Sequence, residues 1–168
     1  PDRLMGLNII EEMKSRGVKK DIELWDGTCY VHEEYDPDMI TYLRQEHSDI
    51  RVLAHPECSP GVLADSDFVG STSQLLNYMK SADAEAFLML TECGLTGRLQ
   101  VEMPDKKFVG SCTMCKYMKS NTLQDIKRVL TKPTDKDRII IDDDIRERAK
   151  NCITEMFRWA EQPPTKKS

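Results

Sequence analysis

Short apolar runs alternate with amphipathic segments through the middle of the chain. Residues 50–54 and 86–90 are such runs, and their length indicates buried strands. Between them, apolar residues recur at helical spacing in 71–79, and Asp36-Pro37 has the composition of a helix start. Short strands that alternate with helices are typical of a parallel sheet covered on both faces. The pattern therefore predicts an α/β fold, with a three-layer α/β/α unit centred on residues 36–110.

Weaker patterns place further elements on both sides of this unit. Strands are predicted at 22–25, 68–69 and 138–141, and helices at Ser59-Pro60, between Asn121 and Pro133, and at 143–161. The last of these helices carries Cys152 on its apolar face. We therefore expect Cys152 to be a core residue.

The charges are mixed along the chain and are not concentrated in one segment. The 24 basic and 29 acidic side chains give a net charge of −5, which argues against nucleic acid as a partner, because phosphate backbones require a basic face. No apolar run approaches the roughly 20 residues of a membrane span, and no signal-peptide pattern opens the chain. We expect a cytoplasmic protein with no membrane partner. Because the first residue is Pro1, we also expect the chain to begin inside a longer polypeptide.

Polar segments follow four of the predicted strands at their carboxyl ends. These segments are 27–32, 55–58, 70–74 and 91–94. Ligands of open α/β sheets bind beyond the carboxyl ends of the strands, and packing does not explain polar residues at all four positions. The sequence therefore predicts a shared active-site rim.

Two of these segments allow both a functional and a structural interpretation. Ser71 and Thr72 stand at a predicted helix start, where their hydroxyl groups could bind a phosphate or simply cap the helix. His55 and Glu57 flank a proline, and they form either an acid–base pair or an ordinary surface pair. The residues alone leave both alternatives open.

The six cysteines do not have the spacing of a secreted disulfide framework. Cys29 lies in a predicted loop that begins with Gly27, which favours an exposed ligand. Cys112 and Cys115 form a single C-x-x-C, so a four-cysteine zinc site is not supported within the chain. Cys58 and Cys93 are ambiguous, and we interpret them as non-ligands because each has a polar neighbour better suited to a site.

Taken together and in order, these segments resemble the signature segments of the quinolinate synthase family. The similar segments are Trp25–His32, His55-Pro56-Glu57, Gly70–Gln74, Thr91–Leu95 and Cys115–Leu123. Pro1–Gly6 and Ile145–Ala149 are similar to that family's sequence as well, so the resemblance covers nearly the whole chain. It implies the C-terminal portion of such an enzyme, without the N-terminal domain.

The resemblance implies three α/β/α domains around a pseudo-threefold axis, each giving one cysteine to a central [4Fe–4S] cluster. Cys29 and Cys115 would be two of these ligands, and the third would lie in the missing N-terminal region. Residues 1–35 would then complete the middle domain and 36–110 would be the third domain. Residues 111–168 would carry the cluster-ligand segment and the C-terminal helices that pack back on the first domain.

The resemblance also implies the reaction, which condenses iminoaspartate with dihydroxyacetone phosphate to give quinolinate for NAD biosynthesis. An open iron of the cluster would act as a Lewis acid. L-aspartate oxidase or aspartate dehydrogenase would be a partner that supplies iminoaspartate. The implied roles are proton transfer by His32, His55 and Glu57, phosphate binding by Ser71 and Thr72, and substrate contact by Met118 and Asn121.

Two other classes of function remain as alternatives. Cys112 and Cys115 could form a redox or metal-binding module without small-molecule catalysis, or the chain could be an inactive structural unit. Under the main hypothesis, two of three ligands cannot complete the cluster. We therefore expect the 168-residue chain alone to hold no stable cluster and to make no quinolinate.

Overall fold

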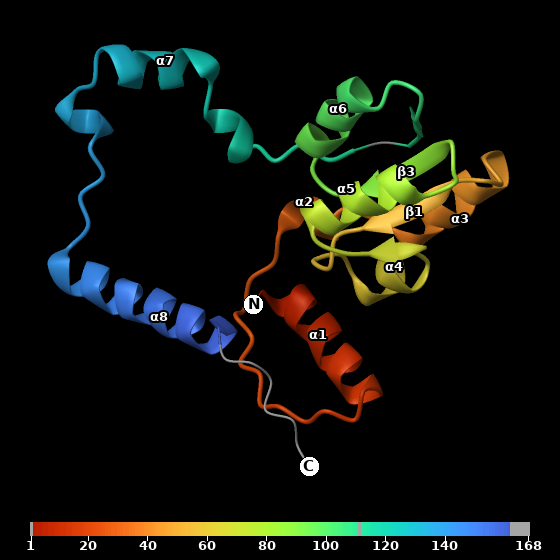
Figure 1. Ribbon diagram of the computed structural model, residues 1–168, viewed down its shortest axis with the longest axis horizontal. Coiled ribbons are helices and arrows are strands. Elements are labelled where there is room, and N and C mark those ends of the chain that lie inside the picture. Colours follow the sequence, from red (N-terminus) through yellow and green to blue (C-terminus); the bar gives the residue numbers. More distant parts are fainter. Residues whose placement is uncertain (1, 111, 162–168) are drawn as a thin grey trace. The chain divides into compact units, whose positions relative to one another are not determined.

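The computed structural model describes residues 2–110 and 112–161. The chain divides into two compact units, Pro1–Ser120 and Asn121–Ser168, which are treated separately below. In Figure 1 the first unit runs from red to green and the second from teal to blue.

A small parallel sheet forms the centre of the first unit. Its strands, in spatial order, are β2 (Phe68–Val69), β1 (Arg51–Ala54), β3 (Ala86–Leu90) and β4 (Lys107–Phe108). All three pairings between them are parallel. The predicted α/β class is confirmed, although β4 was not predicted from the sequence, since Lys107 interrupts its apolar character.

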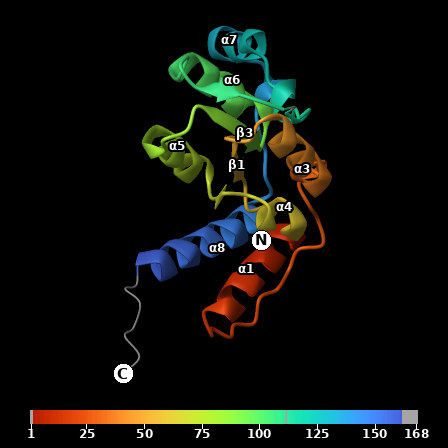
Figure 2. The same cartoon turned by 90° about the vertical axis from the view of Figure 1, so that its right-hand side faces the viewer.

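Helices cover both faces of this sheet. The helices α3 (Pro37–Glu46) and α4 (Pro60–Ala64) pack on one face, and α5 (Thr72–Ser81) and α6 (Cys93–Glu102) pack on the other. Figure 2 shows α3 and α5 on opposite sides of β1 and β3. The three-layer arrangement is the one that the strand and helix pattern predicts.

The central strands are apolar throughout because both of their faces are covered. Leu88 packs in the core on the α3 side, and Leu53 packs in the core on the α5 side. Both side chains are fully buried, and each contributes about 1.5–3 kcal/mol to folding relative to an exposed side chain. The helix starts follow the sequence signals: Asp36 accepts a hydrogen bond from the Asp38 N–H at 2.9 Å and so caps α3.

Two further helices of the first unit come before α3 in the chain, α1 (Arg3–Ser15) and α2 (Tyr30–Glu33). The predicted strand at 22–25 is wrong, because these residues have no regular structure and Trp25 is 77% exposed. A strand requires a neighbour to pair with, and the described residues provide none for this segment. Its apolar residues therefore gave a false signal.

The second unit consists of helical segments: α7 (Leu123–Thr131), the 3₁₀ turn η2 (Asp135–Asp137) and α8 (Asp143–Glu161). Arg128 of α7 makes two hydrogen bonds of 2.8 and 2.7 Å with the Asp137 carboxylate. The predicted strand at 138–141 is wrong, since those residues are irregular. The apolar run there has no partner strand among the described residues.

The expectation that Cys152 is a core residue is also wrong. Cys152 is exposed on α8, and none of the described residues of the second unit is buried. The apolar spacing in α8 is real, but no core covers it within the described part of this unit. No helix in the described ranges is both long enough and apolar enough to span a membrane.

Candidate functional site

A cavity of about 510 Å³ opens beyond the carboxyl ends of β1 and β3. Seven of the sequence-predicted site residues line it: Cys29, His32, His55, Glu57, Thr72, Cys115 and Met118. Ser71 is not among the lining residues, and Asn121 belongs to the second unit. Each of the four polar segments contributes at least one residue to this cavity, although segment 27–32 follows no strand. The roles expected of all nine site residues stay predictions.

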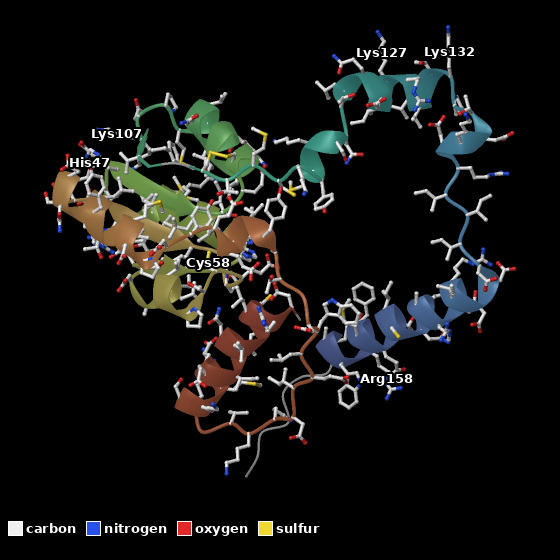
Figure 3. All side chains as sticks on the ribbon, turned by 180° about the vertical axis from the view of Figure 1, so that it is seen from behind. His47, Cys58, Lys107, Lys127, Lys132 and Arg158 are labelled. Atoms are coloured by element: carbon white, nitrogen blue, oxygen red, sulfur yellow. A yellow bond between two sulfur atoms is a disulfide. The ribbon has the colours of Figure 1, made fainter. Side chains whose placement is uncertain are left out.

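A larger cavity lies at the amino ends of the strands and is not the site. It has a volume of about 700 Å³ and is lined by surface residues such as His47 and Lys107. Figure 3 shows these two side chains together at one end of the unit, away from Cys58. None of the predicted functional residues lines this cavity.

A thiol, an imidazole and a carboxylate converge in the smaller cavity. One ligand atom each from Cys29, His32 and Glu57 lie within 4.8 Å of one another. The Nδ1 atom of His32 is 2.9 Å from Oε2 of Glu57, and the Nδ1 atom of His55 is 3.6 Å from the same oxygen. The two imidazole rings are stacked with their centroids 4.7 Å apart. Glu57 therefore stands between two histidines.

Burial keeps both imidazoles neutral. It lowers the pKa of His32 to about 4, and the neighbouring His55 lowers it further while Asp2 opposes the shift. Burial also lowers the pKa of His55, against the opposing effects of Glu57 and Asp2. Although Glu57 is close, neither Nδ1 atom has a hydrogen-bond partner with suitable geometry among the described residues. Each ring is thus uncharged at neutral pH and can bind a metal ion, whereas burial disfavours its protonated form.

The loop that carries Glu57 is fixed by Asn8 of α1. The Asn8 Nδ2 atom donates to the carbonyl oxygens of Pro56 and Cys58, both at 2.9 Å. These two carbonyls flank Glu57 on either side. Sequence reasoning missed this role, because an asparagine within an amphipathic helix gives no signal for a contact fifty residues away.

Glu92 fixes the loop that carries Cys115. Its Oε1 atom accepts a hydrogen bond from the Cys115 N–H at 3.2 Å, and its Oε2 atom accepts one from the Gly94 N–H at 2.5 Å. The Lys119 ammonium lies 3.7 Å from the same carboxylate. Glu92 is only 9% exposed, so a buried carboxylate with several partners sets the position of this loop.

A disulfide between Cys93 and Cys112 adds a covalent link to the same loop. Beside it, the Cys93 N–H donates to the Thr113 carbonyl at 3.1 Å. The alternative hypothesis from the sequence paired Cys112 with Cys115 in a redox or metal-binding module, but the structure bonds Cys112 to Cys93 instead. The free thiol of the pair is that of Cys115.

Cys58 lies in the core cluster on the α3 and α4 side of the sheet (Figure 3). Its thiol donates to the Leu90 carbonyl at 3.5 Å, and burial raises its pKa to about 12. A thiol that stays protonated at neutral pH is a poor metal ligand. These observations agree with the interpretation of Cys58 as a packing residue.

The donor set fits the ligand role that the sequence suggested for Cys29 and Cys115. Both thiols are free and half-buried, and both line the same cavity. Cysteine thiolates are the usual protein ligands of iron–sulfur clusters. The chain thus places two free cysteine thiols at the same cavity.

A parallel three-layer α/β unit with thiols, histidines and a carboxylate beyond its strand ends is typical of enzymes that bind small molecules. Comparison with known proteins narrows this class. The chain belongs to the Quinolinate synthetase A protein family, whose model matches residues 1–158.

Curated relatives agree with this assignment. The chain is 35% identical over 155 residues to the quinolinate synthase of Xylella fastidiosa (strain Temecula1 / ATCC 700964), covering 90% of this chain and 45% of the relative. It is 35% identical over 157 residues to quinolinate synthase 1 of Mesorhizobium japonicum, covering 94% and 46%. It is 32% identical over 167 residues to the quinolinate synthase of Rippkaea orientalis, covering 95% and 49%. The chain therefore spans about half the length of these relatives.

Proposed function

We propose that the chain is the part of a quinolinate synthase that supplies two cluster ligands and most of the proton-transfer groups. The observation that carries this proposal is the convergence of Cys29, Cys115, His32, His55 and Glu57 on one cavity. The third cysteine ligand comes from a part of the enzyme outside this chain. When bound, a [4Fe–4S] cluster with an open iron supplies a Lewis acid for carboxylate or hydroxyl groups.

The histidines and Glu57 move the protons of the reaction. Condensation of iminoaspartate with dihydroxyacetone phosphate loses phosphate and two waters, and each loss of water requires a proton acceptor and a donor. The lowered pKa values of His32 and His55 keep both rings neutral at neutral pH, so that a proton taken up in the reaction is readily released again. Glu57 lies within 3.6 Å of both Nδ1 atoms and can exchange a proton with either ring.

The start of α5 binds the phosphate of the substrate. Thr72 is the first residue of this ten-residue helix, lines the cavity and offers a hydroxyl group beside the helix N-terminus. Arg98 and Lys119 also line the cavity, and they favour substrates with negative charge. Met118 supplies an apolar part of the wall. For Ser71 and Asn121, substrate contact is proposed from the sequence resemblance alone.

The remaining expectations from the sequence belong to this proposal. Residues 1–35 complete the middle domain, 36–110 form the third, and 111–168 pack on a domain outside this chain. The protein acts in the cytoplasm. L-aspartate oxidase or aspartate dehydrogenase supplies iminoaspartate, which hydrolyses in water and therefore has to be delivered quickly. The chain alone holds no stable cluster and makes no quinolinate.

The test is iron content and turnover of the full-length protein, purified without oxygen. The unchanged protein should contain about four iron atoms and form quinolinate from both substrates. Cys29→Ser and Cys115→Ser should each abolish the cluster, whereas Cys152→Ser should retain it, because Cys152 is exposed on α8. A normal iron content in Cys115→Ser would overturn the ligand assignment.

A further inference from the structure

We propose that Cys29, His32 and Glu57 form a binding site for a single divalent transition-metal ion of the zinc class. This inference goes beyond the proposed function and does not depend on it, because all three donors belong to the described chain and Cys115 takes no part.

The three donors are of the kinds that zinc prefers. They provide one sulfur, one nitrogen and one oxygen atom, all within 4.8 Å of one another. In a tetrahedral zinc site, bond lengths of about 2.0–2.3 Å place neighbouring donors about 3.3–3.8 Å apart. The observed separations therefore require only small side-chain movements to surround one ion.

The Nδ1 atom of the His32 imidazole is buried and makes no hydrogen bond with the described residues. The residue is 6% exposed, and its Nδ1 atom has no hydrogen bond among the described residues although Glu57 Oε2 is 2.9 Å away. A buried polar atom without a hydrogen bond is unfavourable, and a metal ion would remove that cost. On the far side of the ring, the Nε2 atom lies 3.4 Å from the Thr91 hydroxyl, which would hold the ring in the orientation of a ligand.

Two backbone segments, α2 with its N-cap residue and the loop after β1, bring the three donor residues together. Cys29 is the N-cap residue of α2, and His32 lies within that helix. The two residues are therefore three positions apart on one helical turn. Glu57 comes from the loop that Asn8 fixes through the flanking carbonyls. The fourth position of the ion would face the cavity of about 510 Å³, where water or a small ligand can bind.

Occupation by one ion has a consequence for Cys29. A thiolate bound to zinc cannot at the same time ligate a cluster, so a zinc-loaded chain would be unable to receive one. The site would make the apoprotein sensitive to zinc.

The test uses cobalt(II) and then zinc with the metal-free 168-residue chain under argon. Cobalt should bind at one ion per chain, with thiolate-to-cobalt charge-transfer absorbance and the strong visible bands of a tetrahedral site. Zinc should displace it, and competition with a chromophoric chelator gives the zinc Kd. Cys29→Ser should abolish the charge-transfer band, and His32→Gln and Glu57→Gln should each weaken zinc binding by at least about tenfold.

Two controls separate this site from other arrangements. Cys152→Ser, on an exposed position of the second unit, and Cys115→Ser should both keep the band and the Kd. Circular dichroism checks the fold of each variant. If His32→Gln does not fold, the zinc Kd of Glu57→Gln tests the proposal in its place. Loss of the band in Cys115→Ser, or unchanged binding in both the Glu57 and His32 variants, would overturn the proposal. Because Cys115 is required for the cluster but not for the single ion, the two proposals can fail independently.

Discussion

The side chain of Tyr30 is hydrogen-bonded to the backbone on both sides of Cys115. Its hydroxyl group donates to the Met114 carbonyl at 3.0 Å and accepts from the Lys116 N–H at 2.6 Å. Tyr30 also follows Cys29 directly in the chain. One residue therefore connects the loops of the two free thiols that share the cavity.

Removal of this hydroxyl group should loosen the Cys115 loop. We expect Tyr30→Phe to lower the free energy of unfolding by about 1–2 kcal/mol, because two hydrogen bonds at a partly exposed site are lost. In the full-length protein the same change should speed the loss of iron on exposure to air. Urea unfolding and the decay of the cluster absorbance measure the two effects.

Tyr42→Phe is the matched control for this experiment. Tyr42 is an exposed tyrosine on α3, and its hydroxyl makes no hydrogen bond with the described residues. It should change neither the unfolding free energy nor the cluster lifetime. Equal effects of the two substitutions would show that Tyr30 does not act through the Cys115 loop.

The pKa of His32 makes stability depend on pH. Because the folded pKa of about 4 is below the ordinary value of 6.5, the unfolded chain binds more protons between these pH values. The stability from the neutral ring is complete above pH 6.5 and is lost as the pH falls toward 4. For a group this well buried, the loss is on the order of 2–3 kcal/mol.

His32→Gln should therefore flatten the pH dependence of the unfolding free energy in this window, measured with the metal-free chain. His47→Gln, at the end of α3, is the control and should leave the slope as it is. If the slope between pH 6.5 and 4 is the same in all three proteins, titration of His32 does not determine it.

The parts that the sequence predicted correctly are those where local pattern and tertiary structure agree. The strands β1 and β3 are apolar because both faces are covered, and α5 begins where the serine and threonine signal places it. The site residues that follow β1, β2 and β3 could be found because a parallel sheet brings these strand ends to one edge. Cys29 and His32 line the same cavity but follow no strand, so this argument does not account for them.

The failures have a common physical cause, since each depends on contacts between distant segments. The runs at 22–25 and 138–141 are apolar but have no neighbouring strand among the described residues. The Cys93–Cys112 bond joins two segments nineteen residues apart, and spacing alone does not reveal the pairing. Asn8 and Glu92 stabilise loops through backbone groups, which no side-chain motif records.

Two measurements can detect the Cys93–Cys112 disulfide: the number of reactive thiols and the free energy of unfolding. The oxidised chain, unfolded in denaturant, should show four reactive thiols, and six should appear after reduction. The double variant Cys93→Ser/Cys112→Ser should unfold with a free energy about 2–4 kcal/mol lower than the oxidised chain, because the unfolded chain loses a covalent constraint. In excess dithiothreitol this difference should largely disappear. Six reactive thiols before reduction would show that the bond does not form.

The last prediction separates the roles of two neighbouring hydroxyl groups at the start of α5. Thr72 lines the cavity, whereas Ser71 is the N-cap residue, and its N–H donates to Gln74 Oε1 at 2.8 Å. In the full-length protein, Thr72→Ala should raise the KM for dihydroxyacetone phosphate by at least about tenfold, since a hydrogen bond to a charged group contributes about 1.5–3 kcal/mol. Thr72→Ser, which keeps the hydroxyl, should restore most of the affinity. Ser71→Ala should lower the unfolding free energy by about 1 kcal/mol with a smaller effect on KM, as expected for a lost cap. An equal rise in KM for Ser71→Ala would instead show that both hydroxyl groups bind the phosphate.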